Sequence, residues 1–187
     1  MGEIRIKKII DHVRTFSRDQ DDFIQEEFDI NKSIENSISM VSEQMDNKEI
    51  AIIFHDKNKL PVINGNTHRF EQVMINLLFN AKDALEERKR KSCQKLRKRI
   101  EISTKVSVDQ IIIEVKDNGI GIKPEEIDKI LLPFFTTKAP GYGTGLGLSI
   151  SYGIIKELNG EIEVQSELLK GTTIRIIIPV ISTSLRE

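Results

Sequence analysis

The sequence has few of the features that mark a secreted or membrane-spanning protein. Its 187 residues include a single cysteine, Cys93, so no intrachain disulfide can form and a reducing compartment is favoured. No metal-ligand spacing surrounds Cys93, which makes an ordinary surface thiol the preferred interpretation. No apolar run approaches the length of a membrane helix, and the N-terminus lacks the apolar core of a signal peptide. We therefore expect no membrane contact from these residues.

An excess of charge of one sign is also missing. Lys and Arg total 28 against 29 for Asp and Glu, so no global field attracts nucleic acid or an anionic membrane. The segment 88–99 is locally basic, but no aromatic residue interleaves for base stacking. A solvated loop is therefore favoured there over a nucleic-acid patch. Any anionic ligand has to be held by a local site.

The length suits one buried α/β core with a short appendage. Apolar residues at helical spacing over 4–16 predict a helix that seeks a partner, and the polar stretch after it is typical of a linker. We expect a helix within 1–18, a linker over 19–27, the main domain over 28–181 and a tail over 182–187.

Within that domain, apolar periodicity predicts helices and strands in mixed order. We expect helices over 32–45, 66–88 and 146–158, the first with Asn31 as its N-cap, and strands over 28–30, 50–54, 62–64, 100–106, 111–115, 161–166 and 172–179. This order favours an α+β fold, a two-layer α/β sandwich whose mixed, mainly antiparallel sheet carries the helices on one face.

One candidate cluster is DNGIG at 117–121, directly after a predicted strand. Its glycines let the backbone turn sharply and approach a flat ligand, and the Asp117 carboxylate can accept a hydrogen bond from an exocyclic amine such as that of adenine. A simple turn explains this motif about equally well when it is taken alone.

A second cluster is GTGLGLS at 143–149, which opens a predicted helix. Free backbone N–H groups and the positive end of the helix dipole suit a polyphosphate there. The loop lacks the Gly-Lys-Ser/Thr ending of a Walker loop and the spacing of a dinucleotide fingerprint. A flexible glycine hinge is the alternative.

The third cluster is a polar stripe on the longest predicted helix. Asn76, Asn80 and Asp83 lie at i, i+4 and i+7, so their side chains share one face. Amide oxygens are hard ligands of the kind that hold nucleotide-bound magnesium. Taken alone, this stripe is more simply a solvated helix face.

Together, these clusters resemble the nucleotide-binding (Bergerat) fold of the GHKL superfamily, which is shared by histidine kinases, gyrase-type topoisomerase subunits, certain chaperones and mismatch-repair ATPases. The segments 76–84, 117–121 and 143–148 look like its N box and two glycine boxes, in family order. PFFTTK at 133–138 resembles the F box of histidine kinases, and Gly171-Thr172 the final glycine-threonine box. The resemblance covers roughly 28–179 and favours the catalytic domain of a sensor histidine kinase.

The resemblance implies ATP and Mg²⁺ as cofactors. Asn80 would coordinate magnesium with Asn76 beside it, Asp117 would bind the adenine amine with Thr172 supporting through water, and residues 123–142 would form a mobile lid. The full set of implied nucleotide-binding residues is Asn76, Asn80, Asp83, Asp117, Gly119, Gly121, Ile122, Thr137, Lys138, Gly143, Thr144, Gly145, Leu146, Gly147, Leu148 and Thr172.

Two positions depart from the family pattern. Asp83 stands where many histidine kinases have lysine, which puts a phosphate contact from this helix in question. Leu131-Leu132 replaces a common Phe-Glu pair, a change that should affect lid packing more than chemistry.

The phosphoacceptor histidine is expected outside these residues. His12 is not followed by the acidic residue and nearby proline of family acceptors, and its surroundings resemble the end of the second dimerisation helix. His55 and His68 look like surface positions. The implied partners are the dimerisation and phosphoacceptor helices of the same protein, as a homodimer, and a response-regulator receiver domain. The implied location is cytoplasmic, in a parent chain that can be anchored in the inner membrane.

Two other functions stay open. One is an ATP-driven clamp of the same superfamily, which typically has a glutamate base where this chain has Asn76. The other is a nucleotide-sensing module without transfer activity.

Overall fold

A five-stranded sheet and a layer of helices form the domain in this computed structural model, which describes residues 25–55, 59–91, 97–138 and 143–180. The sheet has the order β2 (Ala51–His55), β4 (Arg99–Ser107), β5 (Gln110–Asp117), β7 (Gly171–Pro179), β6 (Glu161–Glu167). The β2–β4 pair is parallel, and the other pairs are antiparallel. The expected helix over 4–16 and the tail over 182–187 lie outside the described residues.

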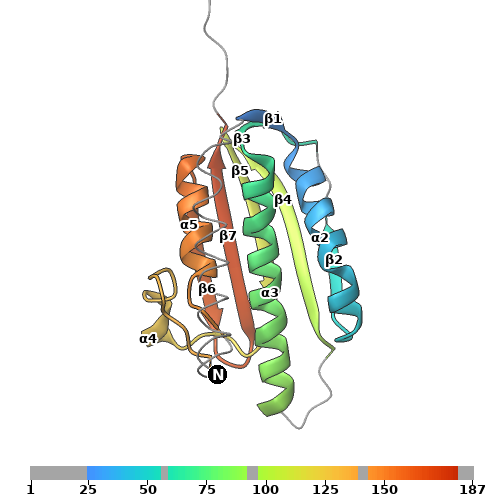
Figure 1. Cartoon of the computed structure of the whole chain (residues 1–187), viewed down its shortest axis with the longest axis vertical. Coiled ribbons are helices and arrows are strands. Elements are labelled where there is room, and N and C mark those ends of the chain that lie inside the picture. The colour runs from blue at the N-terminus through green and yellow to red at the C-terminus, as the bar shows by residue number, and fades with distance from the viewer. Residues whose placement is uncertain (1–24, 56–58, 92–96, 139–142, 181–187) are drawn as a thin grey trace, which may run out of the picture.

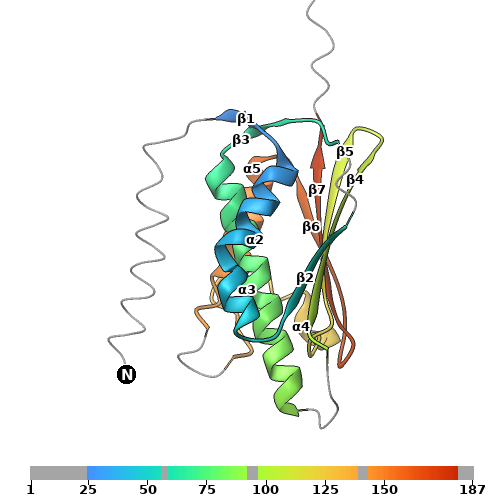
Figure 2. The ribbon, with the colours of Figure 1, turned by 90° about the vertical axis from the view of Figure 1, so that its right-hand side faces the viewer.

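The helices α2 (Ile30–Asp46), α3 (Thr67–Lys91) and α5 (Gly147–Glu157) lie side by side on one face of this sheet, as Figures 1 and 2 show. This arrangement confirms the predicted α+β two-layer sandwich and its mainly antiparallel sheet. The central helix α3 packs between α2 and α5. Helix α3 also contacts the strands β4, β5 and β7 beneath it.

The core lies between α3 and the central strands. The apolar side chains that α3 buries recur at helical spacing: Phe70, Val73, Met74, Leu77, Leu78, Ala81 and Leu85. They meet an isoleucine-rich sheet face formed by Ile100, Ile102, Ile111, Ile113, Ile174, Ile176 and Ile178. Each fully buried side chain of this size contributes about 1.5–3 kcal/mol, so the sheet holds α3 firmly in place.

The start of the domain differs from the sequence-based prediction in two ways. The strand expected over 28–30 lies at β1 (Glu26–Phe28), where it pairs with β3 (Ile63–Gly65) in a separate two-stranded sheet. The predicted N-cap Asn31 is wrong, because the Asp29 carboxylate accepts the backbone N–H groups of Asn31 and Lys32 at 2.8 and 3.2 Å. An aspartate one residue before the helix caps it as well as asparagine does.

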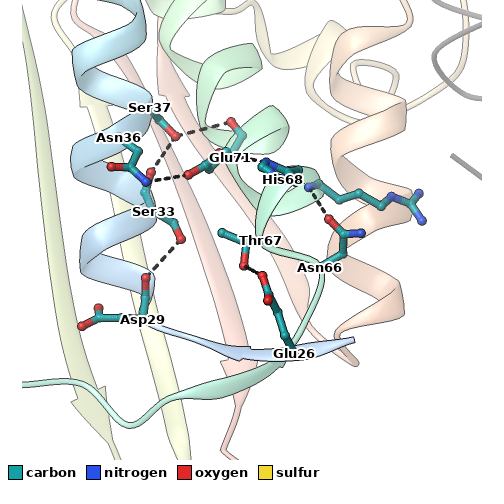
Figure 3. Close-up of polar contacts among 10 residues, drawn as sticks. Glu26, Asp29, Ser33, Asn36, Ser37, Asn66, Thr67, His68 and Glu71 are labelled. Carbon is teal, nitrogen blue, oxygen red and sulfur yellow. Dashed lines mark hydrogen bonds and ion pairs between the residues drawn. The ribbon is translucent and has the colours of Figure 1, made fainter. Parts of the chain in front are cut away.

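Polar contacts fix the register of α2, α3 and β1 at this end of the molecule (Figure 3). The buried Glu71 carboxylate accepts a hydrogen bond from Asn36 at 2.9 Å, while the Ser37 hydroxyl donates to the Ser33 carbonyl at 2.7 Å. Thr67, the first residue of α3, donates to Glu26 at 2.6 Å. These bonds anchor the beginning of α3, the helix whose later turns carry the polar stripe.

The short helix α4 (Pro124–Ile127) follows β5 and was not predicted. Its signal is present in the sequence, because Pro124 begins the helix and Glu125 and Glu126 occupy its first turn. No residue of α4 is buried, so apolar periodicity had nothing to detect.

Candidate functional site

The first residue of the polar stripe on α3, Asn76, lies against the first turn of α5. The Asn76 amide nitrogen lies 3.3 Å from the Gly147 carbonyl and 3.4 Å from the Ser151 hydroxyl. Asn80, one turn further along, is half-buried and makes no side-chain hydrogen bond to any residue that the structure describes. Asn76 thus joins two elements, whereas the amide of Asn80 is available to a ligand.

Asp117 ends β5 with its carboxylate inside the protein. The residue is 8% exposed, and burial raises its pKa to about 6, although the backbone N–H groups of Gly119 and Thr172 and the charge of Arg88 act in the opposite direction. The Gly119 N–H donates to Oδ1 at 2.7 Å. Thr172 is the register partner of Asp117 on β7. A buried carboxylate with acceptor capacity left over suits a donor group on a ligand.

The loop after Asp117 is packed tightly against two neighbours. The Ile120 N–H donates to the Ala84 carbonyl of α3 at 3.0 Å, and a Cβ at Gly119 would lie 2.7 Å from the Ala84 Cβ. Gly121 has a φ of +74°, and a side chain there would meet the Glu167 carbonyl. Both glycines are therefore required by close backbone approach.

Hydroxyl groups complete the same corner of the site. The Ser166 hydroxyl accepts the Ile122 N–H at 2.8 Å, donates to the Gly171 carbonyl at 3.0 Å and lies 2.8 Å from the Thr172 hydroxyl. Ile122 is thus held through its backbone. Ser166 was missed by the sequence analysis, because a lone serine in a strand carries no pattern.

Arg88 was also missed, since the sequence analysis grouped it with the solvated basic segment 88–99. Its guanidinium donates to the carbonyls of Asn118 at 2.7 Å and Gly119 at 3.4 Å. Lys98 in the same segment has a side chain only 3% exposed, which bonds Glu86 at 2.8 Å and the Lys48 carbonyl. For Arg88 and Lys98 the solvated-loop interpretation is wrong, because each cation crosslinks separate backbone segments.

The second glycine loop leads into α5, which starts at Gly147, one residue after the predicted position. No side chain caps this helix, so its first turn offers backbone N–H groups to an anion. Thr144 accepts the Leu146 N–H at 3.4 Å. Leu148 packs against the core, which orients the loop through its helix.

The expected lid, 123–142, contacts this loop through residues that the structure describes. The Phe134 N–H donates to the Gly145 carbonyl at 2.9 Å, and both residues have positive φ, +66° and +70°. Thr137 is exposed. The Lys138 ammonium lies 2.5 Å from the Asp83 carboxylate of α3, so it contacts the polar stripe directly. Residues 139–142 lie outside the described residues.

The donors present fit a magnesium nucleotide. Among the residues that the structure describes, no group of three or more His, Cys, Asp or Glu could hold a metal ion. Nucleotide-bound magnesium needs only one or two protein oxygens, with phosphates and water completing the shell, and the amide of Asn80 can supply one.

The two described histidines agree with their predicted surface positions. The His68 side chain is 92% exposed and His55 is exposed at the end of β2. His12 lies outside the described residues. Among those residues, no helix is long and apolar enough to cross a membrane.

Comparisons with known proteins give one consistent family. Residues 65–182 match the family described as histidine kinase-, DNA gyrase B-, and HSP90-like ATPase. Sensor kinase CckA of Brucella abortus is 39% identical over 149 residues, which is 76% of this chain and 16% of that protein. Sensor histidine kinase ZraS of Escherichia coli K12 is 34% identical over 152 residues, 81% of this chain and 30% of that protein. The chain therefore spans less than a third of either relative.

Solved structures give the same result. The nucleotide-free catalytic domain of histidine kinase ThkA has a TM-score of 0.70 and 29% identity, over 83% of this chain and 95% of that one. ThkA in complex with the response regulator protein TrrA has a TM-score of 0.73 and 25% identity, over 97% of this chain and 49% of that one.

Proposed function

Because this chain belongs to the histidine kinase-, DNA gyrase B-, and HSP90-like ATPase family, we propose that it is the catalytic domain of a two-component sensor histidine kinase. In this role it binds Mg-ATP and transfers the terminal phosphoryl group to a histidine on the dimerisation helix of the parent protein. An aspartate on a response-regulator receiver domain then takes that group.

One observation carries the proposal: the single helix α3 contacts all the elements that would surround a nucleotide. Ala84 binds the loop after β5, Asn76 binds the start of α5, and Asp83 binds the lid. A helix that joins these three places can set the distance between adenine, phosphates and lid. Phosphoryl transfer depends mostly on such positioning and on charge neutralisation.

The chemistry of each protein group indicates which part of the nucleotide it would bind. The Asp117 carboxylate would accept a hydrogen bond from the exocyclic amine of adenine, and the Thr172 hydroxyl would contact the adenine through a water molecule. Gly143, Gly145, Gly147 and the first turn of α5, which no side chain caps, would face the phosphates. Asn80, with Asn76 beside it, would supply amide oxygens to magnesium, and the bound cation would offset the phosphate charge.

Calorimetric titration of the chain with Mg-ATP tests these assignments. Asn80→Ala and Asp117→Asn should each weaken ATP binding by about ten-fold or more, because each removes a bond to a charged or buried partner. Glu43→Gln, on the exposed face of α2, is a matched control that should bind as wild type. Unchanged affinity in both site variants would remove the basis of the assignment.

Transfer activity is tested with γ-labelled ATP and the parent dimerisation hairpin, supplied as a separate polypeptide. Label should appear on the hairpin and stay absent from His12, which is not followed by the acidic residue and nearby proline of family acceptors. Acid-labile phosphate on His12 of the 187-residue chain would contradict this proposal. Rapid hydrolysis of ATP without any transfer would instead favour the clamp alternative.

A further inference from the structure

The ion pair between Asp83 and Lys138 connects α3 to the lid. The Lys138 ammonium lies 2.5 Å from Asp83 Oδ2, and the two side chains are 32% and 39% exposed. Neither residue belongs to the hydrophobic core, so packing alone does not explain why they meet. The partial burial leaves the pair less screened than one in free solvent.

Lys138 is also confined from the side of the glycine loop. A Cβ at Gly143 would lie 3.0 Å from Lys138 Cδ and 2.8 Å from the Thr136 hydroxyl oxygen. The Lys138 N–H donates to that same hydroxyl at 3.2 Å. The ammonium is therefore held where α3, the lid and the second glycine loop come together.

The neighbouring lysine on the helix is engaged elsewhere. The Lys82 ammonium lies 4.8 Å from the centre of the Phe79 ring and 4.0 Å from Asp83 Oδ1. The ring attracts the cation, and Lys82 makes a longer contact with Asp83 than Lys138 does. Of these two lysines, Lys138 is the one whose ammonium is drawn to the polar stripe from another element.

We infer that Asp83 is a positioning residue, which holds the lid cation Lys138 against α3 so that it meets the terminal phosphate of ATP. This inference rests on the proposed function. An ammonium has three donors; Asp83 uses one and leaves the others for phosphate oxygens. The cation comes from the lid, so the phosphate contact depends on the lid lying against α3.

This arrangement predicts that the chain distinguishes ATP from ADP. Lys138 contacts the terminal phosphate, so the Asp83–Lys138 pair should raise affinity for ATP and leave affinity for ADP unchanged. A residue with a purely structural role would alter both affinities together. The ratio of the two dissociation constants therefore separates positioning from folding.

A double-mutant cycle on the 187-residue chain measures the coupling. Asp83→Asn should weaken Mg-ATP binding by about two- to five-fold, the range expected for a partly exposed ion pair, and Lys138→Met by about ten-fold. Asp83→Asn should have no further effect in the Lys138→Met background. Mg-ADP affinity should stay at the wild-type value in all three variants, as should ATP affinity in the Glu43→Gln control.

A charge swap provides the rescue. Asp83→Lys combined with Lys138→Asp rebuilds the pair with the cation on the helix, and it should recover ATP affinity relative to either single change. Unchanged or tighter ATP binding in Asp83→Asn, or additive effects in the cycle, would overturn the positioning role. If the wild-type chain binds neither nucleotide, the proposed function itself fails. If the wild-type chain binds ATP but the effects of Asp83→Asn and Lys138→Met on ATP affinity are additive, only the role of Asp83 is refuted.

Discussion

The loop after β5 and the lid before α5 both depend on glycine, but the protein holds them in different ways. The loop after β5 is fixed by backbone bonds to α3, by the Arg88 guanidinium and by the Ser166 hydroxyl. The lid is attached through the Asp83–Lys138 pair and the Phe134–Gly145 bond, and Phe134 itself is 67% exposed. The rigid loop after β5 suits recognition of a flat base, and the loosely attached lid suits binding of a phosphoryl group that is transferred.

The largest effect should come from crowding the rigid end with Gly171→Ala. Gly171 has a φ of +130°, and a Cβ there would meet the backbone carbonyl of Asp117, which cannot move without shifting β5. We expect a loss of about 3 kcal/mol or more in the free energy of unfolding. Calorimetric unfolding should show a midpoint lowered by about 10 °C. A wild-type midpoint would mean that this end is not rigid.

Asp117→Asn, in the same rigid end, should weaken ATP binding without lowering the unfolding temperature. Burial raises the pKa of Asp117 to about 6, so burying the charged carboxylate destabilises the folded chain. An amide at this position carries no charge and avoids that cost. We expect unfolding at the wild-type temperature or above, together with at least about ten-fold weaker ATP binding. Asp109→Asn, in the exposed turn at the other end of β5, is the matched control and should leave both quantities unchanged.

The pH dependence tests the same carboxylate without mutation. Asp117 is protonated as pH falls through about 6, and a protonated carboxyl is a poorer acceptor. Lowering the pH from about 7 to about 5 should weaken ATP binding by about ten-fold beyond the change seen in Asp117→Asn. Titrations of both proteins across that range measure the difference, and parallel curves would contradict it.

As the pH is lowered, the contribution of Asp117 to the free energy of unfolding should rise, whereas ATP binding should weaken. The folded pKa of Asp117 is above the ordinary value of 3.8, so its relative contribution to stability is present below 3.8 and is lost as pH rises through about 6. The wild-type chain should therefore lose free energy of unfolding relative to Asp117→Asn over this window. Urea unfolding at matched pH values measures that loss, and a constant difference would show that burial does not perturb this group.

The sequence predicted the two-layer fold and the elements of the rigid end well, because apolar periodicity and glycine motifs are local signals. It missed what depends on long-range contact. Arg88 looked like part of a solvated basic run, yet it bonds a loop thirty residues away, and Ser166 carries no motif at all. Asp83 was placed on the polar stripe and noted as a departure from the family pattern, but its ion pair with Lys138 was not predicted, because the fold brings Lys138 to it.

The smallest effect should come from Gly143→Ala in the lid region. A new Cβ would lie 2.8 Å from the Thr136 hydroxyl and 3.0 Å from Lys138 Cδ, and both are side-chain atoms that can rotate away. We therefore expect the free energy of unfolding to stay within about 0.5 kcal/mol of wild type. ATP binding should weaken by about two-fold, because the displaced Lys138 meets Asp83 less well. Urea unfolding and calorimetry on one preparation measure both quantities. If Gly143→Ala destabilised the chain as much as Gly171→Ala, the lid would be as tightly built as the loop after β5, and the distinction between the two ends would fail.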